Sequence, residues 1–515
     1  MNHWIVAPIV LPAILAPFII MVLRYHLDLQ RIFSVAGTVG LLGIALTLTA
    51  QASTGEIQTY ELGNWRAPFG IVLVLDRMSA MMVLLTAVLA LPVVLYAIGS
   101  GWDERGRHFH PLFQFQLMGV AGAFLTGDAF NLFVFFEVLL IASYGLMTHG
   151  GGAVRLKAGV QYVAYNLLGS TLFLFALGTL YGVTGTLNMA DLAVRVAEMP
   201  AEDTALLRVG AVLLLLVFCV KAAVLPLHFW LPASYANAPL PVAALFAIMT
   251  KVGSYSILRI YTLVFGPDVA ATSGLVGDWL LPAALLTLAV GTIGILGAQH
   301  IARLVAFGVI GSMGTLLIAV SLFNAEATAA ALYYTVHSTF AAALLFLTAD
   351  LVISRQGGAI TDKTPMAQTG LISCLFFAGA IALAGMPPLS GFIGKLLVLD
   401  ASRSNPDYPL IWAVILISSL VTIVGLARAG SLIFWKSHET RHNPELEPGN
   451  KDEEVAKPAP EPDAGLAFSA VFGVLAGLAM LTLFAGPALE YTRSTAKQLF
   501  SPAGYIEAVL KGDQE

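Results

Sequence analysis

Charged residues and cysteine are scarce in this sequence of 515 residues. Asp, Glu, Lys and Arg make up 11% of it, whereas soluble globular proteins carry about 25%, so a soluble globular chain is excluded. The two cysteines, Cys219 and Cys374, are too few for a disulfide framework and belong to no Cys/His metal pattern. A net charge of −5 offers no basic surface to nucleic acid. We therefore expect no metal site and no nucleic-acid partner.

Enzymatic motifs are absent as well. The sequence has no phosphate-binding glycine motif, no nucleophile elbow and no HExxH helix, so we expect neither an enzyme nor a bound cofactor. The apolar segment at residues 1–23 lacks a basic n-region and an A-x-A cleavage site. It predicts a retained first helix rather than a cleaved signal peptide.

Apolar residues, in contrast, make up 58% of the chain and occur in long runs. Runs of roughly 18–25 residues are typical of membrane-spanning helices and not of the short alternating strands of an outer-membrane barrel. The predicted fold is all-α, a polytopic membrane protein of about 14 transmembrane helices. The predicted spans are 4–23, 32–51, 76–98, 111–127, 129–148, 159–184, 206–225, 240–264, 279–298, 301–322, 328–353, 367–401, 409–435 and 465–486.

Basic residues are concentrated in every second loop. These loops hold Arg24 and Arg31, Arg105 and Arg107, Arg155 and Lys157, Arg303, Arg355 and Lys363, and Lys436 and Arg441. Cytoplasmic loops carry an excess of Lys and Arg. The alternation therefore predicts a multi-pass membrane protein with both termini on the outer side and an even number of spans.

The chain divides into five parts. They are an N-terminal three-helix segment (1–110), two five-span units (111–264 and 279–435), a polar, Pro-rich cytoplasmic linker (437–463), and a last span with its tail (464–515). Each unit holds one broken helix, at Pro226 in the first and at Pro387 and Pro388 in the second. Gly/Pro-interrupted spans in corresponding places indicate inverted repeats around a midplane site. An odd number of spans gives consecutive units opposite orientations.

Two lysines lie deep in the apolar runs around the first break. The pattern predicts a helix from Leu206 to Leu225 that carries Lys221, and a second from Leu240 to Thr262 that carries Lys251. A lysine at bilayer depth costs about 2.5–3.5 kcal/mol on insertion scales, so it should face a protein-lined interior and have a partner. Pro226 also leaves the Ala222 carbonyl without its helical donor.

Three further ionisable groups lie in the spans. Glu137 needs a cation on another helix, and Lys221 is the predicted partner, either as a coupled pair or as a static ion pair that joins two helices. His337 can relay protons near neutral pH or be a hydrogen-bonded core histidine. Lys395, beside the second break, is the last member of the row.

Polar neighbours could support such a row. Ser143, Tyr255, Ser338 and Thr339 could hold connecting waters, although hydroxyls of this kind also join helices by hydrogen bonds. His228, in the break, could connect Lys221 to the cytoplasm or act as a structural cap. Carboxylates near span ends are interpreted as interface residues; these are Asp76, Asp128, Asp350 and Asp400.

With these residues in hand, the chain resembles the antiporter-like membrane subunits shared by respiratory complex I, membrane-bound hydrogenases and Mrp (multiple resistance and pH) cation/proton antiporters. The likeness runs from about 75 to 485. It is carried by Phe135–Glu137, Phe218–Pro226, His228–Pro232, Ala238–Leu245, Thr250–Gly253, Arg303–Gly308 and Gly385–Lys395. The segments Trp230–Pro239 and Ala243–Lys251 look most like the corresponding sequences of Mrp subunits of the D type.

The resemblance implies a role for each matching position. Glu137 and Lys221 would form the coupling pair, Lys251 and His337 the central relay, and Lys395 the distal proton gate. It also implies a location in a bacterial cytoplasmic (inner) membrane and membership of a hetero-oligomer with subunits of the A, B, C, E, F and G types. The expected activity is transport of protons against a cation, expected to be Na⁺, in contact with membrane lipid and without a redox cofactor.

Two other functions stay open on the sequence alone. The same fold could serve a redox-driven proton pump of a complex I-like or hydrogenase complex, and neighbouring genes would separate that machine from an antiporter. The chain could also be a non-transporting structural subunit, in which case substitution of the lysines would be silent.

Overall fold

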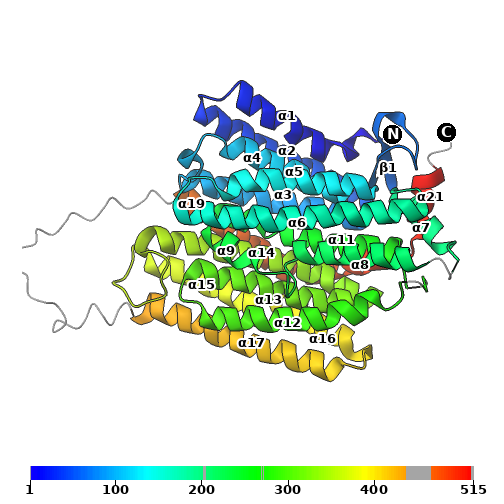
Figure 1. Ribbon diagram of the computed structural model, residues 1–515. Coiled ribbons are helices and arrows are strands. Elements are labelled where there is room, and N and C mark those ends of the chain that lie inside the picture. The colour runs from blue at the N-terminus through cyan, green and yellow to red at the C-terminus, as the bar shows by residue number, and fades with distance from the viewer. Residues whose placement is uncertain (1, 201–203, 268, 271, 437–464, 512–515) are drawn as a thin grey trace, which may run out of the picture.

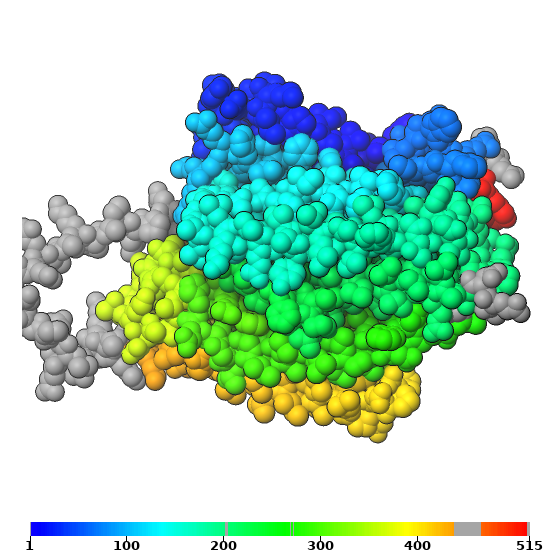
Figure 2. Space-filling view, viewed as in Figure 1, coloured from blue at the N-terminus to red at the C-terminus, as the bar shows by residue number. Residues whose placement is uncertain are grey.

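The computed structural model describes residues 2–200, 204–267, 269–270, 272–436 and 465–511. Long helices lie side by side along one direction and form a bundle (Figure 1). The predicted linker at 437–463 falls outside the described residues. Figure 2 shows the chain crossing one face in successive strips, from the N-terminal helices through the first unit to the second.

The long apolar runs fold as helices because a helix satisfies its own backbone groups where no water is present. Helices occupy every predicted span. They are α1 (Ala7–Met21), α2 (Leu27–Ala52), α3 (Arg77–Gly99), α4 (Phe109–Leu125), α5 (Ala129–Met147), α6 (Ala153–Thr184), α8 (Thr204–Lys221), α10 (Leu240–Phe246), α11 (Met249–Leu263), α12 (Leu275–Gly297), α13 (Ile301–Ser321), α14 (Ala325–Gln356), α15 (Thr369–Ala384), α16 (Ser390–Ala401), α17 (Tyr408–Gly430) with the π-helical turn η6 (Ser431–Trp435), and α19 (Gly465–Leu483).

Within the described residues, 11 helical segments are long and apolar enough to cross a membrane. This number counts α10 with α11 and α17 with η6. The other predicted spans correspond to shorter helices: α1 has 15 residues, α4 has 17, and the span at 367–401 is divided into α15 and α16. The predicted all-α polytopic membrane fold is confirmed.

Shorter elements connect the long helices or follow them. They are the helices α7 (Met189–Ala197), α9 (Trp230–Asn237), α20 (Ala485–Leu499) and α21 (Ala503–Lys511), the 3-10 turns η1 (His3–Ile5), η2 (Leu62–Asn64), η3 (Asp103–Arg105) and η5 (Ser402–Ser404), and the strands β1 (Gln58–Glu61) and β2 (Val72–Leu75). The strands form an antiparallel hairpin with Gln58 opposite Leu75, which was not predicted from the sequence. Both chain ends lie at the same end of the bundle, beside this hairpin, α7 and α21 (Figure 1).

Two of the three most enclosed membrane-spanning segments carry ionisable groups of the row. The apolar windows of α10–α11, α13 and α14 are 100%, 94% and 89% buried, against 33% for α2, α17 and α19. Lys251 on α11 and His337 on α14 therefore lie in the middle of the bundle and not on its surface.

The first break begins earlier than predicted. Helix α8 ends at Lys221 rather than at Leu225, and Ala223 then adopts a left-handed conformation with φ 55°. A proline clashes with the carbonyl four residues before it, so Pro226 prevents Ala222 from continuing the helix. Lys221 is consequently the last residue of α8 and not a residue of its interior.

The segment predicted as one helix from Leu240 to Thr262 is also interrupted. The amides of Ala247 and Ile248 donate to carbonyls three residues back, Ala244 at 3.3 Å and Leu245 at 3.2 Å, in the manner of a 3-10 turn. Helix α11 starts directly afterwards, so Lys251 lies in its first turn.

Candidate functional site

Glu137 lies near the middle of α5. The Asp128 carboxylate accepts the Asn131 amide at 2.7 Å and starts the helix, and a rise of about 1.5 Å per residue then carries Glu137 into the apolar interior. The side chain is half-buried, and its carboxylate accepts a hydrogen bond from the Ser170 hydroxyl of α6. A serine from a neighbouring helix thus holds the acid.

Lys221 is held by the same helix that holds Glu137. It is 5% exposed, and its ammonium Nζ donates to the Asn166 carboxamide oxygen at 3.1 Å. The ammonium also lies 5.6 Å from the centre of the Phe136 ring, within the range of a cation–π contact. Its position at the C-terminal end of α8 is favourable as well, because the unpaired carbonyls there carry partial negative charge.

The predicted contact between Glu137 and Lys221 is not direct in this structure, which records no ion pair within 4.0 Å between these two described residues. Asn166 and Ser170 lie four residues apart, on one face of α6, and each holds one member of the pair. One face of α6 therefore bridges the acid and the amine.

Lys251 is the most enclosed of the lysines. It is 0% exposed, and its Nζ has no hydrogen-bond partner among the described residues. Gly253 brings its helix against the end of α8: a Cβ there would lie 2.7 Å from the Ala222 nitrogen and 2.9 Å from the Phe218 oxygen. Because no side chain fits between the helices, the two lysine-bearing segments meet backbone to backbone.

His337 lies on α14 and faces the second break. Its ring Nδ1 lies 2.9 Å from the Ser390 hydroxyl at the start of α16. Gly391 permits this approach, because a Cβ there would lie 2.8 Å from the ring Nε2. The histidine lies near enough to both Lys251 and Lys395 for the charges of the two amines to act on it.

Lys395 closes over the end of α15. Its Nζ donates to the Ala384 carbonyl at 2.8 Å and to the Ser419 hydroxyl of α17 at 2.8 Å. Ala384 is the last residue of α15, and Gly385 follows it with φ 76°. A helix that ends inside the bundle leaves carbonyls free, and the ammonium satisfies one of them.

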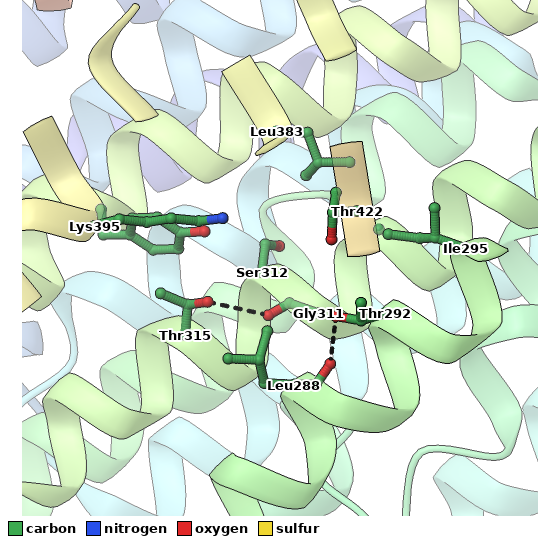
Figure 3. A pocket seen from close by; sticks show the side chains of 11 residues that line it. Leu288, Thr292, Ile295, Gly311, Ser312, Thr315, Leu383, Lys395 and Thr422 are labelled. Atoms are coloured by element: carbon green, nitrogen blue, oxygen red, sulfur yellow. Dashed lines mark hydrogen bonds between the residues drawn. The ribbon is translucent and has the colours of Figure 1, made fainter. Parts of the chain in front are cut away.

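A small cavity lies beside Lys395. It has about 10 Å³ of space, enough for about one water molecule. Hydroxyl groups from three helices line it, namely Thr292, Ser312, Thr315 and Thr422. Figure 3 shows the Lys395 amine pointing toward these groups. Protons could pass between the amine and water here.

The predicted supporting residues differ in their hydrogen-bond partners. Ser338 and Thr339 both donate to the Thr335 carbonyl of their own helix, at 3.3 Å and 2.8 Å. Ser143 donates to Leu140 of its own helix at 2.6 Å, and its hydroxyl also lies 2.9 Å from the Tyr162 hydroxyl of α6. Tyr255 donates to the Phe124 carbonyl of α4 at 2.6 Å.

The residues of the two breaks differ in exposure. His228 is buried, and its Nδ1 lacks a hydrogen-bond partner among the described residues. Pro226, Pro387 and Pro388 are exposed on the surface of the bundle. No group of three or more His, Cys, Asp or Glu side chains suited to a metal ion occurs in the part of the chain that the structure describes.

The neutral groups that hold the charged ones were not predicted from the sequence. Asn166, Ser170, Ser390 and Ser419 each contact one member of the row. The available signal was the spacing of Asn166 and Ser170, two polar residues one turn apart in an otherwise apolar run.

Two carboxylates near span ends also have partners inside the protein. Asp350, interpreted as an interface residue, is buried and accepts hydrogen bonds from Tyr96 at 2.9 Å and from the Trp102 indole. Asp76, interpreted in the same way, forms a buried ion pair with Arg259 at 2.5 Å. Asp400 is exposed and pairs with Arg403 at 3.1 Å.

Outside the spans, Asp103 forms the centre of a second charged group. It contacts Arg31 of α2 at 2.6 Å and His110 of α4 at 3.2 Å. Burial raises the pKa of the Asp103 carboxyl, but the hydrogen bonds with His110 and Arg31 outweigh burial and hold the pKa below its ordinary value. This group joins three segments and is not part of the buried row.

Comparison with known families and structures identifies the family of the chain. The family described as "NADH:quinone oxidoreductase/Mrp antiporter, TM" matches residues 126–422, more than half of the chain. Among solved structures, the chain is similar to one in the Mrp complex from Dietzia sp. DQ12-45-1b, with a TM-score of 0.86 and 29% identity over 99% of this chain and 100% of that one.

A chain of an archaeal membrane-bound sulfane sulfur reductase is also similar, with a TM-score of 0.86 and 26% identity over 98% of this chain and 99% of that one. A chain of respiratory complex I from Thermus thermophilus shares the fold, with a TM-score of 0.75 and 23% identity over 96% of this chain and 99% of that one.

Full-length relatives narrow the assignment. The D-type subunit of the Na(+)/H(+) antiporter of Bacillus subtilis is 38% identical over 99% of this chain and 100% of its own length. The D-type subunit of the probable K(+)/H(+) antiporter of Rhizobium meliloti is 40% identical over 99% of this chain and 98% of its own length. The chain therefore belongs to the NADH:quinone oxidoreductase/Mrp antiporter transmembrane family and, within it, to the D-type subunits of Mrp antiporters.

Proposed function

We propose that this protein conducts protons in a multisubunit antiporter that exchanges them for a monovalent cation, expected to be Na⁺. Protons move along Lys221, Lys251, His337 and Lys395, and Glu137 controls the first step. The partners are the other antiporter subunits, of the A, B, C, E, F and G types. Both termini lie on the outer side of the bacterial cytoplasmic membrane.

One observation carries the proposal. Lys251 is 0% exposed, lies on a helix whose membrane-spanning window is 100% buried, and has no hydrogen-bond partner among the described residues. A buried charge without a partner is costly, and intramembrane ionisable groups are functional by default. An amine whose protonation no fixed partner holds is suited to take up and release a proton.

The groups on either side of Lys251 are suited to the neighbouring steps. His337 interacts electrostatically with both Lys251 and Lys395, and an imidazole can accept a proton at one ring nitrogen and release it from the other. Lys395 then passes the proton to water in the hydroxyl-lined cavity beside its amine (Figure 3).

Glu137 and Lys221 supply the control. A nearby carboxylate favours the charged form of an amine, and loss of that interaction favours the neutral form. The two groups are joined through Ser170 and Asn166 on α6, so displacement of α6 would change how strongly the acid acts on the amine. Lys221 would then gain or release its proton toward Lys251.

The energies involved are of matching size. A membrane potential of 100 mV supplies about 2.3 kcal/mol per charge moved. One pKa unit corresponds to about 1.36 kcal/mol. The potential can therefore drive a change in proton affinity of roughly two pKa units at each switching step.

The test is a flux assay on the complete antiporter complex in proteoliposomes, with a pH-sensitive dye inside and Na⁺ or K⁺ outside. Lys221→Ala, Lys251→Ala and Glu137→Ala should each abolish cation-driven proton movement while the complex still assembles. Lys157→Ala is the matched control, because that lysine is exposed at the start of α6 and its loss should leave flux unchanged. Normal flux in the Lys251 variant would reject the proposed path.

The same assay decides the cation. Relatives carry names with Na⁺ and with K⁺, and the initial rates with each ion, compared at equal concentration, will establish which one this complex exchanges. A rate with Na⁺ that does not exceed the rate with K⁺ would overturn the expectation of Na⁺.

A redox-driven proton pump is the second candidate. The likeness to a chain of an archaeal sulfane sulfur reductase, at a TM-score of 0.86, favours it. Purification of the native complex separates the two: co-purified iron–sulfur subunits would support the pump, whereas antiporter subunits alone support the exchange of cations for protons.

A further inference from the structure

A buried ion pair outside the proposed path joins two helices close to the chain ends. Arg259, on α11, donates to both oxygens of Asp76, at 2.5 Å and 2.8 Å, and the two residues are 3% and 2% exposed. A buried charge pair is rarely worth its desolvation for stability alone, because apolar residues of similar size often serve as well. Its presence calls for a second reason.

Arg259 shares one face of α11 with Lys251. Tyr255 lies one turn after Lys251 and Arg259 one turn further, which places the guanidinium about 12 Å along the helix axis from the lysine. The Arg259 Nε donates to the Tyr255 hydroxyl at 3.2 Å. A single helix face therefore connects the central amine to the ion pair.

A small cavity lies on the far side of the pair. Asp76, Arg259, Thr262, Gln498 and Tyr505 are among its lining residues, and its space of about 10 Å³ has room for about one water molecule. The Tyr505 hydroxyl is buried and has no hydrogen-bond partner within the described part of the chain. A buried hydroxyl of this kind is costly unless it meets water or another ligand.

The C-terminal helices cover this cavity. Gln498 of α20 accepts the Arg77 amide at 3.1 Å and donates to the Gly55 carbonyl at 3.1 Å. Tyr505 of α21 lies with its ring 5.4 Å from the Arg259 guanidinium. In Figure 1, α21 lies at the end of the bundle that also holds β1 and the N-terminus.

We propose, building on the proton path described above, that Asp76 and Arg259 form a second proton site, which connects Lys251 to the surface beside the chain ends under the cover of α21. Asp76 carries the proton, and Arg259 is the positioning residue. A guanidinium does not deprotonate in proteins, so Arg259 acts through its fixed charge.

The transfer is balanced at each step. A proton leaves the Lys251 ammonium for water. The Tyr255 hydroxyl turns away from the Phe124 carbonyl to which it donates in this structure, takes up the proton on its oxygen and gives its own proton to the Asp76 carboxylate, which leaves a neutral amine and a neutral acid. The acid then releases the proton to water in the cavity beside Tyr505, and Asp76 pairs again with Arg259. The reverse order carries a proton inward.

Asp76→Asn is the principal test, measured as flux per assembled complex, because it also leaves the buried Arg259 guanidinium without its charged partner and so lowers stability. Asp76 also caps α3, accepting the Ser79 amide at 2.8 Å, and asparagine is as good a cap as aspartate but cannot carry a proton. In the reconstituted complex we expect cation-driven proton flux per assembled complex to be lowered by about tenfold. Asp76→Glu should restore part of the flux.

Tyr505→Phe tests the cavity independently. It removes only a hydroxyl that has no hydrogen-bond partner among the described residues, so stability should not fall, whereas flux should. Tyr491→Phe is the matched control: that hydroxyl donates to the Arg77 carbonyl at 2.8 Å on the same covering helices but does not line the cavity, and flux should be unchanged. Asp103→Asn, which breaks a buried ion pair beyond the other end of α3, should also leave flux per assembled complex unchanged.

Wild-type flux in assembled Asp76→Asn and Tyr505→Phe complexes would overturn the proposal. If Asp76→Asn fails to assemble, Tyr505→Phe alone decides. Failure here is distinct from failure of the main path: normal flux in Lys251→Ala would reject both, whereas inactive Lys251→Ala with active Asp76→Asn would reject only this second site.

Discussion

At the scale of the residue, neutral side chains determine how the charged ones are held. Asn166 accepts a hydrogen bond from Lys221, Ser170 donates one to Glu137, and Ser390 and Ser419 contact His337 and Lys395. A neutral partner satisfies a hydrogen bond without fixing the charge of the group it holds. Such contacts leave each ionisable group free to change its protonation.

Replacing one neutral partner by a charged side chain should therefore fix the protonation of the group that it holds and slow proton transfer along the path. Asn166→Asp would place a carboxylate where the carboxamide oxygen now lies, 3.1 Å from the Lys221 ammonium, and hold the amine in its charged form. We expect intact assembly and proton flux lowered by about tenfold in the proteoliposome assay.

Thr171→Val serves as the control for this variant. Thr171 lies on the exposed side of α6 and bonds to its own helix, so flux should not change. An Asn166→Asp complex that transports as fast as this control would show that Asn166 does not govern the amine.

Asp103 provides a pH-dependent prediction outside the spans. Because its pKa is held below the ordinary value, after burial is outweighed by His110 and Arg31, the carboxylate stabilises the fold above the unfolded pKa of about 3.9. That stability is lost as the pH falls through the lower folded pKa. Asp103→Asn should therefore lower the melting temperature of the purified protein at neutral pH, and the difference from wild type should shrink below about pH 4.

Asp28→Asn is the matched control for that measurement. Its carboxylate also pairs with Arg31, at 3.6 Å, but its side chain is 93% exposed, and exposed pairs contribute little. It should melt like the wild type at every pH. A constant difference between Asp103→Asn and wild type across the whole pH range would contradict the assignment.

At the scale of the element, the interrupted helices bring the lysines together. Helix α8 ends at Lys221, and α11 begins just before Lys251. Gly253 lets the two segments touch, since a Cβ there would overlap backbone atoms of Phe218 and Ala222. Backbone atoms cannot move aside as a flexible side chain can, so this contact tolerates no larger residue.

Gly253→Ala should consequently separate α11 from α8. Overpacking typically costs about 1–3 kcal/mol, and we expect a lower melting temperature together with reduced proton flux. Gly182→Ala, in α6, has nothing within 4 Å of the added Cβ and should be neutral or slightly stabilising. Equal melting temperatures for the two variants would contradict the close approach.

The elements were more predictable from the sequence than their ends and faces. Long apolar runs located each helical span, because length and hydropathy are properties of the segment itself. The end of α8 was placed four residues too late, because the clash of Pro226 acts backward along the chain. The β1–β2 hairpin was missed, since four-residue strands carry too short a pattern to detect.

The sequence predicted how deep the site residues lie in the membrane-spanning segments, but not which way their side chains point. Glu137 and Lys221 were recognised as unusual in apolar runs, yet a sequence does not tell which way a side chain points around its helix. Asn166 and Ser170 therefore remained hidden as the groups between them. Arg259 lies toward the end of its helix, where long basic side chains commonly reach the membrane surface, so its buried pairing with Asp76 was not foreseen.

At the scale of the whole molecule, the two chain ends lie together at one end of the bundle (Figure 1). Combined with the alternation of basic loops, this arrangement predicts that both ends lie outside the cell membrane. Alkaline phosphatase fused after Glu515 should be active, and green fluorescent protein at the same site should be dark.

A reporter inserted within 437–463 should give the opposite pattern, because that segment is predicted to be cytoplasmic. Fluorescence from the C-terminal fusion would reverse the orientation of the entire bundle, although the helices themselves would be unaffected.

Helix α6 is one element that holds both members of the Glu137–Lys221 pair. It lies toward the outside of the bundle, with only 39% of its apolar window buried. Its side chains form hydrogen bonds with the Glu137 carboxylate and with the Lys221 amine. A neighbouring subunit that displaces α6 would weaken both hydrogen bonds at the same time. Glu137 and Lys221 would then lose their α6 partners simultaneously and not one after the other.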